Sequence, residues 1–462
     1  MPSLTSEFKD KYLNLLGQIE AQRFFAAIAD PSKKAFRFNS LKAQIPVSYD
    51  LNTPVPVIPQ AYYGQISGQD PEWVSGRVYS QDPAAMFPAY AAQVHPGERV
   101  LDLCAAPGGK TTALTEALQG SGLLVANEIS PSRVKILREN LERWGVSNSL
   151  ITNMDPASLA AHFPSFFDCI VVDAPCSGEG MFRKNPDAIN YWSPDYVTSC
   201  AERQREILKS ALTMLKPSGR LIYATCTFSP EEDEGIVSWL LGHYPLTLQP
   251  VTGLRDLSVR HGQPRWAGGN PALEACLRFW PQDNVGEGQF LAVLQSVALK
   301  SGTATKQRIH KKRAPRDQEI LTRQEQALVT SVMQSFKLPA ALSDYQQQLR
   351  VRKQHVFLPV LPAEQIKGLK VINNGVEFGL LKKNRFEPGH QLAMVLGQEA
   401  QTSQVTLTSA ADYQHYLHGE TVKVDPTLRG FVLVSYQGAI FSFGKVSPTG
   451  VIKNFYPKGL RQ

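Results

Sequence analysis

The chain has 462 residues, of which 43% are hydrophobic and 19% are charged, so it is long enough for about three domains of ~150 residues with real cores. Its first residues lack the layout of a signal peptide, and no apolar run approaches the ~18 residues that cross a bilayer, so we expect a cytoplasmic protein. The six cysteines form no CxxC pair, which argues against a zinc site and a disulfide framework.

The net charge of +7 is concentrated in the last third of the chain. Residues 300–462 contain 23 Lys and Arg against 11 Asp and Glu, whereas residues 1–299 contain 25 against 30. A basic region of this size favours an acidic polymer such as RNA as a partner. A solvated basic surface without a partner is the alternative.

Residues 1–75 predict a small N-terminal α/β module. The amphipathic pattern FKDKYLNLLGQIEAQRFFAAI is typical of helix, and the later stretch AFRFNSL can form a strand. Arg37 lies in that stretch and is a candidate contact to an RNA backbone. An exposed strand residue without a ligand explains it equally well.

Residues 76–299 predict a doubly wound α/β domain, because strand-like and helix-like segments alternate at the spacing of βαβ units. Such a sheet binds its ligands at the carboxyl ends of its parallel strands. Several expected strands end on a chemically useful side chain, so we expect these residues to converge. They are Cys104, Glu128, Asp155, Asp173 and Cys226.

The turn CAAPGGK at residues 104–110 has three interpretations. It is typical of a methyltransferase that binds S-adenosylmethionine, because Glu128 follows about 20 residues later to hold ribose hydroxyls. A phosphate-binding P-loop is a second interpretation, although Cys104 stands where its signature requires glycine. A tight turn without a ligand is the third.

Two cysteines stand beside strand ends, in Asp173-Ala174-Pro175-Cys176 and in Thr225-Cys226-Thr227. A thiolate that adds to carbon 6 of a pyrimidine activates carbon 5 for methyl transfer, and a carboxyl group such as Asp173 stabilises the adduct at the base N3 edge. Methylation of an amino group needs no thiol and usually uses an Asn/Asp-Pro-Pro-aromatic turn, which is absent here. The pattern therefore favours carbon methylation, with two small buried thiols as the alternative.

The remaining residues predict a linker and two C-terminal modules, at 300–318, 319–398 and 399–462. The linker is basic, and Lys311, Lys312 and Arg313 either lie along phosphates or form a solvated connection. The last module is strand-rich and basic, as suits RNA binding, with Phe455 or Tyr456 available for stacking. Its candidate phosphate contacts are Lys445, Lys453, Lys458 and Arg461.

The motifs LDLCAAPGGKTT, NEIS, DAPCSGEGMF and YATCTFSPEEDE resemble those of the Nop/Sun family of RNA cytosine-5 methyltransferases. The domain order, with an N-terminal module and a basic PUA-like C-terminus, is similar to the bacterial branch that acts on small-subunit (16S) ribosomal RNA. The resemblance implies a Rossmann-like class I fold, S-adenosylmethionine as cofactor, ribosomal RNA, free or in an assembled subunit, as partner, and no metal or membrane.

The resemblance also implies roles for individual residues. Glu128 would hold the cofactor ribose, Asp155 would lie near the adenine, and Asp173 would bridge the cofactor and the target base. Cys226 would be the nucleophile and Cys176 would assist release, a choice that the residues alone leave open. The expected cofactor turn comprises Cys104, Ala105, Ala106, Pro107, Gly108, Gly109 and Lys110.

Two rival functions remain at this point. A P-loop NTPase would use Asp173 to hold magnesium. An RNA-binding ribosome-assembly factor would carry the methyltransferase core as a vestige.

Overall fold

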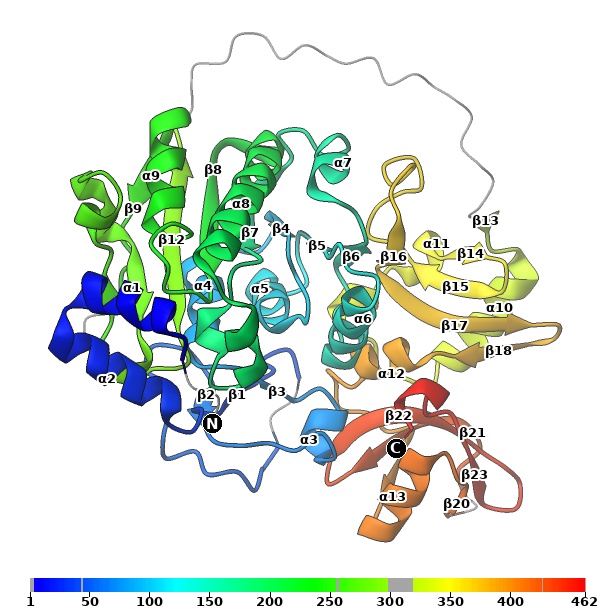
Figure 1. Ribbon diagram of the computed structural model, residues 1–462. Helices are drawn as coiled ribbons and strands as arrows, with labels where there is room; N and C mark the ends of the chain where they lie inside the picture. The colour runs from blue at the N-terminus through cyan, green and yellow to red at the C-terminus, as the bar shows by residue number, and fades with distance from the viewer. Residues whose placement is uncertain (1–3, 43–44, 255–256, 298–318, 426, 462) are drawn as a thin grey trace.

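The computed structural model describes residues 4–42, 45–254, 257–297, 319–425 and 427–461. These residues form four sheets, of which the largest has ten strands (Figure 1). None of the helices in these ranges is long and apolar enough to cross a membrane. The expected linker at residues 300–318, with Lys311, Lys312 and Arg313, lies outside the described residues.

The N-terminal module consists of two helices and a three-stranded antiparallel sheet of order β2-β1-β3. Strand β3 lies beyond residue 75, so this sheet extends past the boundary expected from the sequence. The elements are α1 (Ser6–Leu16), α2 (Gln18–Ala29), β1 (Ala35–Phe38), β2 (Ala61–Tyr63), α3 (Pro71–Val74) and β3 (Val78–Ser80).

The ten-stranded sheet is the Rossmann-like core and confirms the predicted fold class. Its order is β10-β11-β12-β8-β7-β4-β5-β6-β16, with β9 beside β12, and the five strands from β4 to β8 run parallel. The strands are β4 (Arg99–Asp102), β5 (Leu123–Asn127), β6 (Ser149–Thr152), β7 (Phe167–Asp173), β8 (Leu215–Thr225), β9 (Leu246–Gln249), β10 (Arg260–His261), β11 (Leu277–Phe279), β12 (Gln289–Ser296) and β16 (Val371–Asn374).

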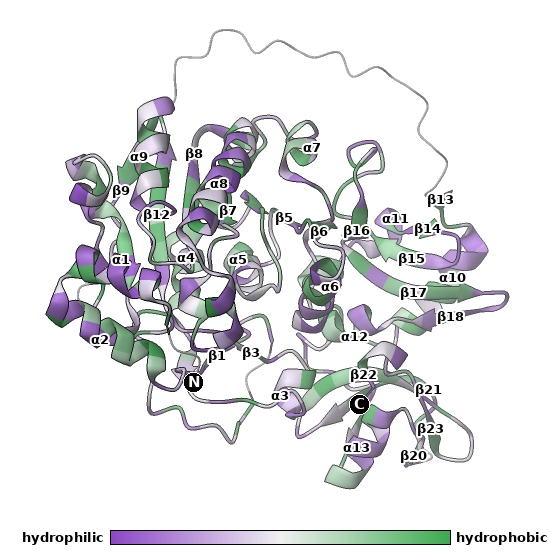
Figure 2. Ribbon diagram, in the orientation of Figure 1, coloured by the Kyte–Doolittle hydropathy of each residue, from purple (hydrophilic) through white to green (hydrophobic). Residues whose placement is uncertain are grey.

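Helices cover both faces of this sheet, so its central strands are buried on both sides. Val100 and Leu124 pack toward α4 and α5, whereas Leu101 and Val125 pack toward α8 and α9. The central strands accordingly contain long hydrophobic stretches, although β8 has polar residues near its start; α8 mixes both kinds of residue (Figure 2). The helices are α4 (Phe87–Ala91), α5 (Gly109–Leu118), α6 (Arg133–Trp144), α7 (Pro156–Ala160), α8 (Pro194–Met214) and α9 (Glu234–His243).

Short 3₁₀ turns complete this domain, and two of them lie in the segment between Cys176 and α8. The turns are η1 (Ala84–Met86), η2 (Glu179–Met181), η3 (Pro186–Tyr191), η4 (Pro264–Trp266), η5 (Pro271–Ala275) and η6 (Pro281–Asp283). The N-terminal helices pack on this part of the domain: Phe24 of α2 contacts the stacked rings of Phe228 and Trp280 edge-on. The N-terminal module thus shares a core with the loop that follows β8.

The first C-terminal module contains a five-stranded antiparallel sheet, β13-β14-β15-β17-β18. Its helix α10 begins at a capping box in which Thr322 and Glu325 satisfy each other's backbone N–H groups. The elements are β13 (Glu319–Ile320), α10 (Arg323–Met333), η7 (Ala340–Leu342), α11 (Tyr345–Gln348), β14 (Arg350–Arg352), β15 (His355–Leu358), β17 (Val376–Lys382), β18 (Arg385–Pro388) and α12 (His390–Leu396).

Strand β16 leaves this module and extends the ten-stranded sheet. It pairs antiparallel with β6, with Asn374 opposite Leu150. The region expected as a separate module at 319–398 therefore contributes one strand to the sheet of the domain before it. The hydrophobic pattern of so short a strand does not reveal which sheet it joins.

The C-terminal module is a mixed five-stranded sheet of order β19-β21-β22-β23-β20 with one helix. Leu433 and Phe443 of this sheet share a core with α12, so the two C-terminal modules are packed together. The elements are β19 (Gln404–Leu407), α13 (Ala410–His418), β20 (Val422–Lys423), β21 (Gly430–Tyr436), β22 (Ala439–Val446), β23 (Val451–Asn454) and η8 (Lys458–Leu460).

Strand β4 ends on a buried acid, Asp102, which is 1% exposed. Thr111 donates a hydrogen bond of 2.7 Å to its Oδ2 atom. Burial raises the pKa of Asp102 to about 7, and the nearby charge of Asp173 adds to the effect. Since the folded pKa exceeds the unfolded value, the stability that Asp102 contributes is present in full below pH ~4 and is lost as the pH rises to ~7.

We therefore expect the Asp102→Asn variant to lose less stability than the wild type between pH 5 and pH 8. The difference is at most about 4 kcal/mol, because about three pKa units separate the two states. Urea unfolding at both pH values measures it. Asp168→Asn is the control, because the pKa of Asp168 is lowered and its titration lies below this window; equal pH slopes in all three proteins would contradict the assignment.

Candidate active site

The ends of the parallel strands meet at a cavity of about 540 Å³. The sequence predicted that these ends would converge, and all five expected residues line this one cavity together with Cys176. Those lining residues are Cys104, Glu128, Asp155, Asp173, Cys176 and Cys226. The convergence follows from the topology, since neighbouring parallel strands end at the same edge of the sheet.

The turn at residues 104–110 forms one wall of the cavity. Arg133 of α6 donates a hydrogen bond of 2.6 Å to the Ala106 carbonyl, and Asn140 donates one of 2.7 Å to the Pro107 carbonyl. Helix α6 thus fixes the turn from behind, while Cys104 and Ala106 face the cavity. Burial raises the pKa of the Cys104 thiol above its ordinary value, so this cysteine stays protonated.

The side chains that a P-loop would use for phosphate and magnesium are engaged elsewhere. The Thr111 hydroxyl donates to Asp102 in the core, and Lys110 Nζ lies 2.7 Å from Asp173 Oδ2. In a P-loop the hydroxyl would hold magnesium and the lysine would reach the phosphates. This geometry does not support the P-loop interpretation of the turn.

Glu128 follows β5 and is 2% exposed. Its Oε1 atom accepts a hydrogen bond from the Ser130 backbone N–H at 2.8 Å, and Arg133 lies 3.4 Å from Oε2. Asp155 follows β6, caps α7 through the Ser158 N–H, and is exposed at the cavity rim. These hydrogen bonds to Ser158 hold the pKa of Asp155 below its usual value, so two carboxylates border one side of the cavity.

The two cysteines of the sequence motifs face each other across the cavity mouth. Their Sγ atoms are 3.4 Å apart, one in the loop after β7 and the other in the loop after β8. The hydrogen bond to Cys226, then burial and the negative charge of Cys226, raise the pKa of Cys176 well above its ordinary value. Cys176 is therefore a thiol that keeps its proton.

Lys110, Asp173 and Gln289 form a polar group at the end of β7. Burial alone would lower the pKa of Lys110, but the charge and hydrogen bond of Asp173 and the charge of Cys226 raise it above its ordinary value. Gln289 Nε2 donates to Asp173 Oδ1 at 3.3 Å. Gln289 is not among the residues expected from the sequence; its only signal is its place at the start of β12, beside β8.

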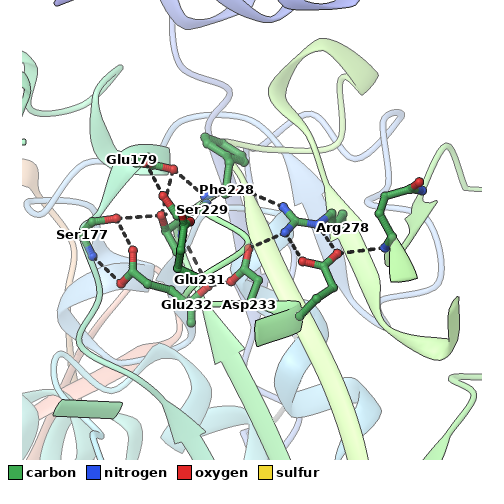
Figure 3. Close-up of polar contacts among 12 residues, drawn as sticks. Ser177, Glu179, Phe228, Ser229, Glu231, Glu232, Asp233 and Arg278 are labelled. Carbon is green, nitrogen blue, oxygen red and sulfur yellow. Dashed lines mark hydrogen bonds and ion pairs between the residues drawn. The ribbon is translucent and has the colours of Figure 1, made fainter. Parts of the chain in front are cut away.

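Buried polar side chains behind the cysteine loops were also missed (Figure 3). Glu179 and Glu232 lie in those loops, and each accepts hydrogen bonds from the other loop. Burial raises the pKa of Glu232 to about 7. Arg278 of β11 donates to the Phe228 carbonyl and contacts Asp233 and Glu234, so the end of the Cys226 loop is anchored to the antiparallel part of the sheet.

Only some of the candidate RNA contacts in the C-terminal module are exposed. Lys445 and Lys453 are exposed and stand opposite each other on β22 and β23. Lys458 is exposed as well, whereas Arg461 lies against Gly419 and donates to the Tyr456 carbonyl. Tyr456 is 6% exposed and packs in the core of the module, which removes it as a stacking platform.

Arg37 is buried and does not reach the surface. It is 5% exposed and donates to Thr112 at 2.7 Å and to the Gly109 carbonyl, and it also pairs with Glu116. These contacts hold the N-terminal sheet against the first turns of α5. We therefore remove Arg37 from the candidate RNA contacts: the short pattern AFRF alternates little, and the sequence did not show that both faces of β1 are covered.

A metal centre finds no support in the described part of the chain. Across residues 4–42, 45–254, 257–297, 319–425 and 427–461, no group of three or more His, Cys, Asp or Glu side chains is arranged to hold an ion.

Four family profiles match successive parts of the chain. They are the N-terminal domain of 16S rRNA methyltransferase RsmF at residues 4–83, 16S rRNA methyltransferase RsmB/F at 89–295, the first C-terminal domain of RsmF rRNA methyltransferase at 334–396, and the PUA domain of methyltransferase RsmF at 404–462.

Individual proteins show the same likeness. The ribosomal RNA small subunit methyltransferase F of Psychromonas ingrahamii is 32% identical over 99% of this chain and 97% of its own length. Its namesake in Escherichia coli K12 is 35% identical over 64% of each chain. A solved methyltransferase homologue from Pyrococcus horikoshii is 27% identical, with a TM-score of 0.54 over 63% of this chain and 94% of that one.

A second solved structure, NSun6 of Pyrococcus horikoshii with SFG, is 20% identical, with a TM-score of 0.53 over 64% of this chain and 99% of that one, and shares the fold. S-adenosylmethionine, the cofactor expected from the sequence, is the methyl donor of these enzymes. The full-length likeness to the Psychromonas protein and the four consecutive matches agree on one family. The chain belongs to the RsmB/F family of 16S rRNA methyltransferases.

Proposed function

We propose that this protein methylates carbon 5 of cytosine in small-subunit ribosomal RNA through a covalent adduct with Cys226. The single observation that carries the proposal is the pair of thiols 3.4 Å apart at the mouth of the cavity formed by the acid-bearing strand ends. Methyl transfer to nitrogen or oxygen requires no such pair. The names of the full-length relatives support ribosomal RNA as the substrate.

The cavity fits S-adenosylmethionine in its chemistry. Glu128 would accept hydrogen bonds from the ribose hydroxyls, Asp155 would lie near the adenine, and Asp173 would face the charged amino acid end. The apolar wall formed by Ala106 and Ile129 suits an adenine ring. When bound, the cofactor supplies a methyl group on a positively charged sulfur.

Cys226 acts as the nucleophile in this proposal. Its thiolate adds to carbon 6 of the cytosine, and the electrons of the C5–C6 double bond make carbon 5 nucleophilic. The Lys110–Asp173 pair at 2.7 Å keeps an ionisable proton at the base N3 edge, where its donation neutralises the charge that develops on the ring. Gln289 restrains the second oxygen of Asp173.

Cys176 acts in release. Carbon 5 carries both the new methyl group and a proton after transfer, and this proton must leave before the Cys226–C6 bond can break. Once Cys226 is covalently bound, its charge and its hydrogen bond no longer raise the pKa of Cys176. Cys176 can then lose its proton to solvent and accept the carbon 5 proton. The proton at N3 returns to the Lys110–Asp173 pair, the double bond re-forms and the Cys226 thiolate is expelled.

Two exposed lysines of the C-terminal sheet, on the face that α12 also covers, support RNA recruitment. Phe431, Lys445 and Lys453 lie in one row across β21, β22 and β23. Like charges directly opposite each other destabilise a sheet, and an RNA phosphate between them would remove that repulsion. Phe431 and Phe455 lie beside the two lysines, with their ring centroids 5.2 Å apart. The exposed Lys458 follows on η8.

We expect Cys226→Ala to lower methyl transfer to small-subunit RNA at least ~100-fold, because the covalent step is lost. Cys176→Ala should instead accumulate a protein–RNA adduct at Cys226, seen as a slow band on a denaturing gel and mapped by mass spectrometry. Cys276→Ala, a buried thiol away from the cavity, is the control. Adduct formation by Cys226→Ala would reverse the two roles, and full activity of that variant would exclude the covalent route.

We expect Glu128→Gln to weaken S-adenosylmethionine binding at least ~10-fold, because hydrogen bonds to a buried charged acceptor contribute about 1.5–3 kcal/mol. Isothermal titration calorimetry measures the dissociation constant. Glu139→Gln, on the exposed side of α6, should bind like the wild type. An unchanged affinity in Glu128→Gln would place the ribose elsewhere.

We expect Lys445→Ala with Lys453→Ala to weaken RNA binding and to reduce the slope of log K against log salt by about 1.5–2, since two phosphate contacts are removed. At saturating RNA the turnover number should stay at the wild-type value, because the cavity is intact. Lys216→Ala, at the opposite end of the catalytic sheet, is the control. An unchanged salt slope in the double variant would show that this face does not bind RNA.

A further inference from the structure

Each of the two cysteine loops places a glutamate carboxylate against hydrogen-bond donors of the other loop (Figure 3). Glu179, three residues after Cys176, points into the loop of Cys226, and Glu232, six residues after Cys226, points into the loop of Cys176. These contacts surround the two residues that directly follow the cysteines, Ser177 and Thr227, whose hydroxyl oxygens are 2.7 Å apart.

Glu179 accepts more hydrogen bonds than Glu232. Its Oε2 atom accepts from the Phe228 N–H at 2.8 Å, from the Thr227 hydroxyl at 2.9 Å and from the Tyr12 hydroxyl at 2.5 Å. Its Oε1 atom accepts from Trp192 Nε1 and from the Ser229 hydroxyl, both at 2.7 Å. Glu179 is 1% exposed, so water does not compete for these bonds.

No lysine or arginine in the described ranges forms an ion pair with Glu179. Five hydrogen-bond donors therefore stabilise the carboxylate without a counter-ion, and hydrogen bonds to a charged acceptor are the strong kind. Three of these donors belong to consecutive residues of the Cys226 loop: Thr227, Phe228 and Ser229. The carboxylate thus determines the path of the backbone immediately after the proposed nucleophile.

The backbones of the two loops also touch beside Glu179. The Gly180 N–H donates to the Cys226 carbonyl at 2.8 Å, and a Cβ atom on Gly180 would lie only 2.8 Å from that oxygen. Glycine at this position lets the loops approach closely enough for the contact. Glu179 and Gly180 together fix the position of Cys226 from the Cys176 side.

The N-terminal helix α1 also contacts Glu179 and one of its donors, Ser229. Tyr12 is fully buried and donates to Glu179; burial first, and then the charge and hydrogen bond of Glu179, raise the pKa of Tyr12 well above its ordinary value. Lys11 Nζ donates to Ser229 Oγ and pairs with Glu231, both at 2.9 Å. Helix α1 therefore contacts Glu179 and the far end of the Cys226 loop.

We propose that Glu179 is a positioning residue of the methyl transfer, which holds Cys226 beside Cys176 and links their geometry to helix α1 of the N-terminal module. The inference rests on the proposed roles of the two cysteines. Glu179 does not touch the cavity; it acts through the backbone and hydroxyl groups of the Cys226 loop.

Replacement by glutamine tests the proposal sharply, because an amide cannot satisfy all five donors. If the NH₂ group takes the Oε2 position, it faces the Phe228 N–H; if it takes the Oε1 position, it faces the Trp192 N–H. The hydroxyl donors can turn and accept, but neither N–H group can. In either orientation, the Phe228 N–H or the Trp192 N–H therefore loses its acceptor.

The experiment uses the full-length protein and two readouts. For Glu179→Gln we expect kcat on small-subunit RNA to fall at least ~10-fold, since small displacements of a reacting group are costly. The dissociation constant for S-adenosylhomocysteine should change less than ~2-fold, because Glu128 and Asp155 lie on other strands. Glu72→Gln replaces a buried carboxylate of α3 and should match the wild type in both.

The second readout reports the thiol positions without the reaction. Diamide should oxidise Cys176 and Cys226 to a disulfide quickly in the wild type, because their sulfur atoms are 3.4 Å apart. In Glu179→Gln we expect this disulfide, quantified as a cross-linked peptide by mass spectrometry, to form at least ~5-fold more slowly. A wild-type oxidation rate in the folded variant would overturn the inference, whatever the turnover.

Two further variants separate failure of this inference from failure of the proposed function. If Glu179→Gln does not fold, Tyr12→Phe removes a single donor, and slower disulfide formation and turnover are expected; wild-type values of both would overturn the inference. Full activity of Cys226→Ala would refute the proposed function itself. The oxidation rate of Glu179→Gln would still decide whether Glu179 positions the thiols.

Discussion

The parallel pairing of β7 with β8 is the constraint on which the rest of the site depends. Each strand ends in a loop that carries one cysteine, and only neighbouring strands that run in the same direction deliver two such loops to one edge of the sheet. Register matters as much as direction, because Asp173 pairs with Ala224, so Cys176 and Cys226 leave the sheet at nearly the same level. The 3.4 Å between the thiols follows from this topology.

Hydrogen bonding to buried carboxylates converts that approximate proximity into a defined geometry. Two loops rich in small residues would not hold a fixed spacing by packing alone. Glu179 and Glu232 each accept from the opposite loop, and Arg278 anchors the far end of the Cys226 loop through Asp233 and Glu234. A buried polar network of this kind favours one arrangement, because the alternatives leave more of its groups unpaired.

Charge is divided between the two halves of the molecule. Carboxylates border the cavity at the strand ends, whereas the exposed lysines of the C-terminal sheet suit phosphates. Strand β16 and the shared cores join these halves, since β16 extends the catalytic sheet and α12 packs on the C-terminal sheet. Continuous packing thus connects the basic half to the half that contains the cavity.

The sequence alone determined the fold class, the cavity and the candidate chemistry. Alternating strand and helix patterns predict a doubly wound sheet, and the side chains that end its strands are then expected to converge, as Cys104, Glu128, Asp155, Asp173 and Cys226 do. Local patterns suffice here because the position of a strand end in a parallel sheet depends on the strand itself and on the direction of its neighbours.

Only the tertiary structure decided which residues are exposed and which long-range partners they meet. Arg37 is only a candidate RNA contact by sequence, and the structure buries it against α5. Strand β16 pairs with the ten-stranded sheet rather than with the sheet of its own module. Glu179 lies inside a recognised motif, yet its partners Tyr12, Trp192 and Ser229 come from three distant segments. Such contacts depend on how separate elements pack, and no local periodicity encodes that packing.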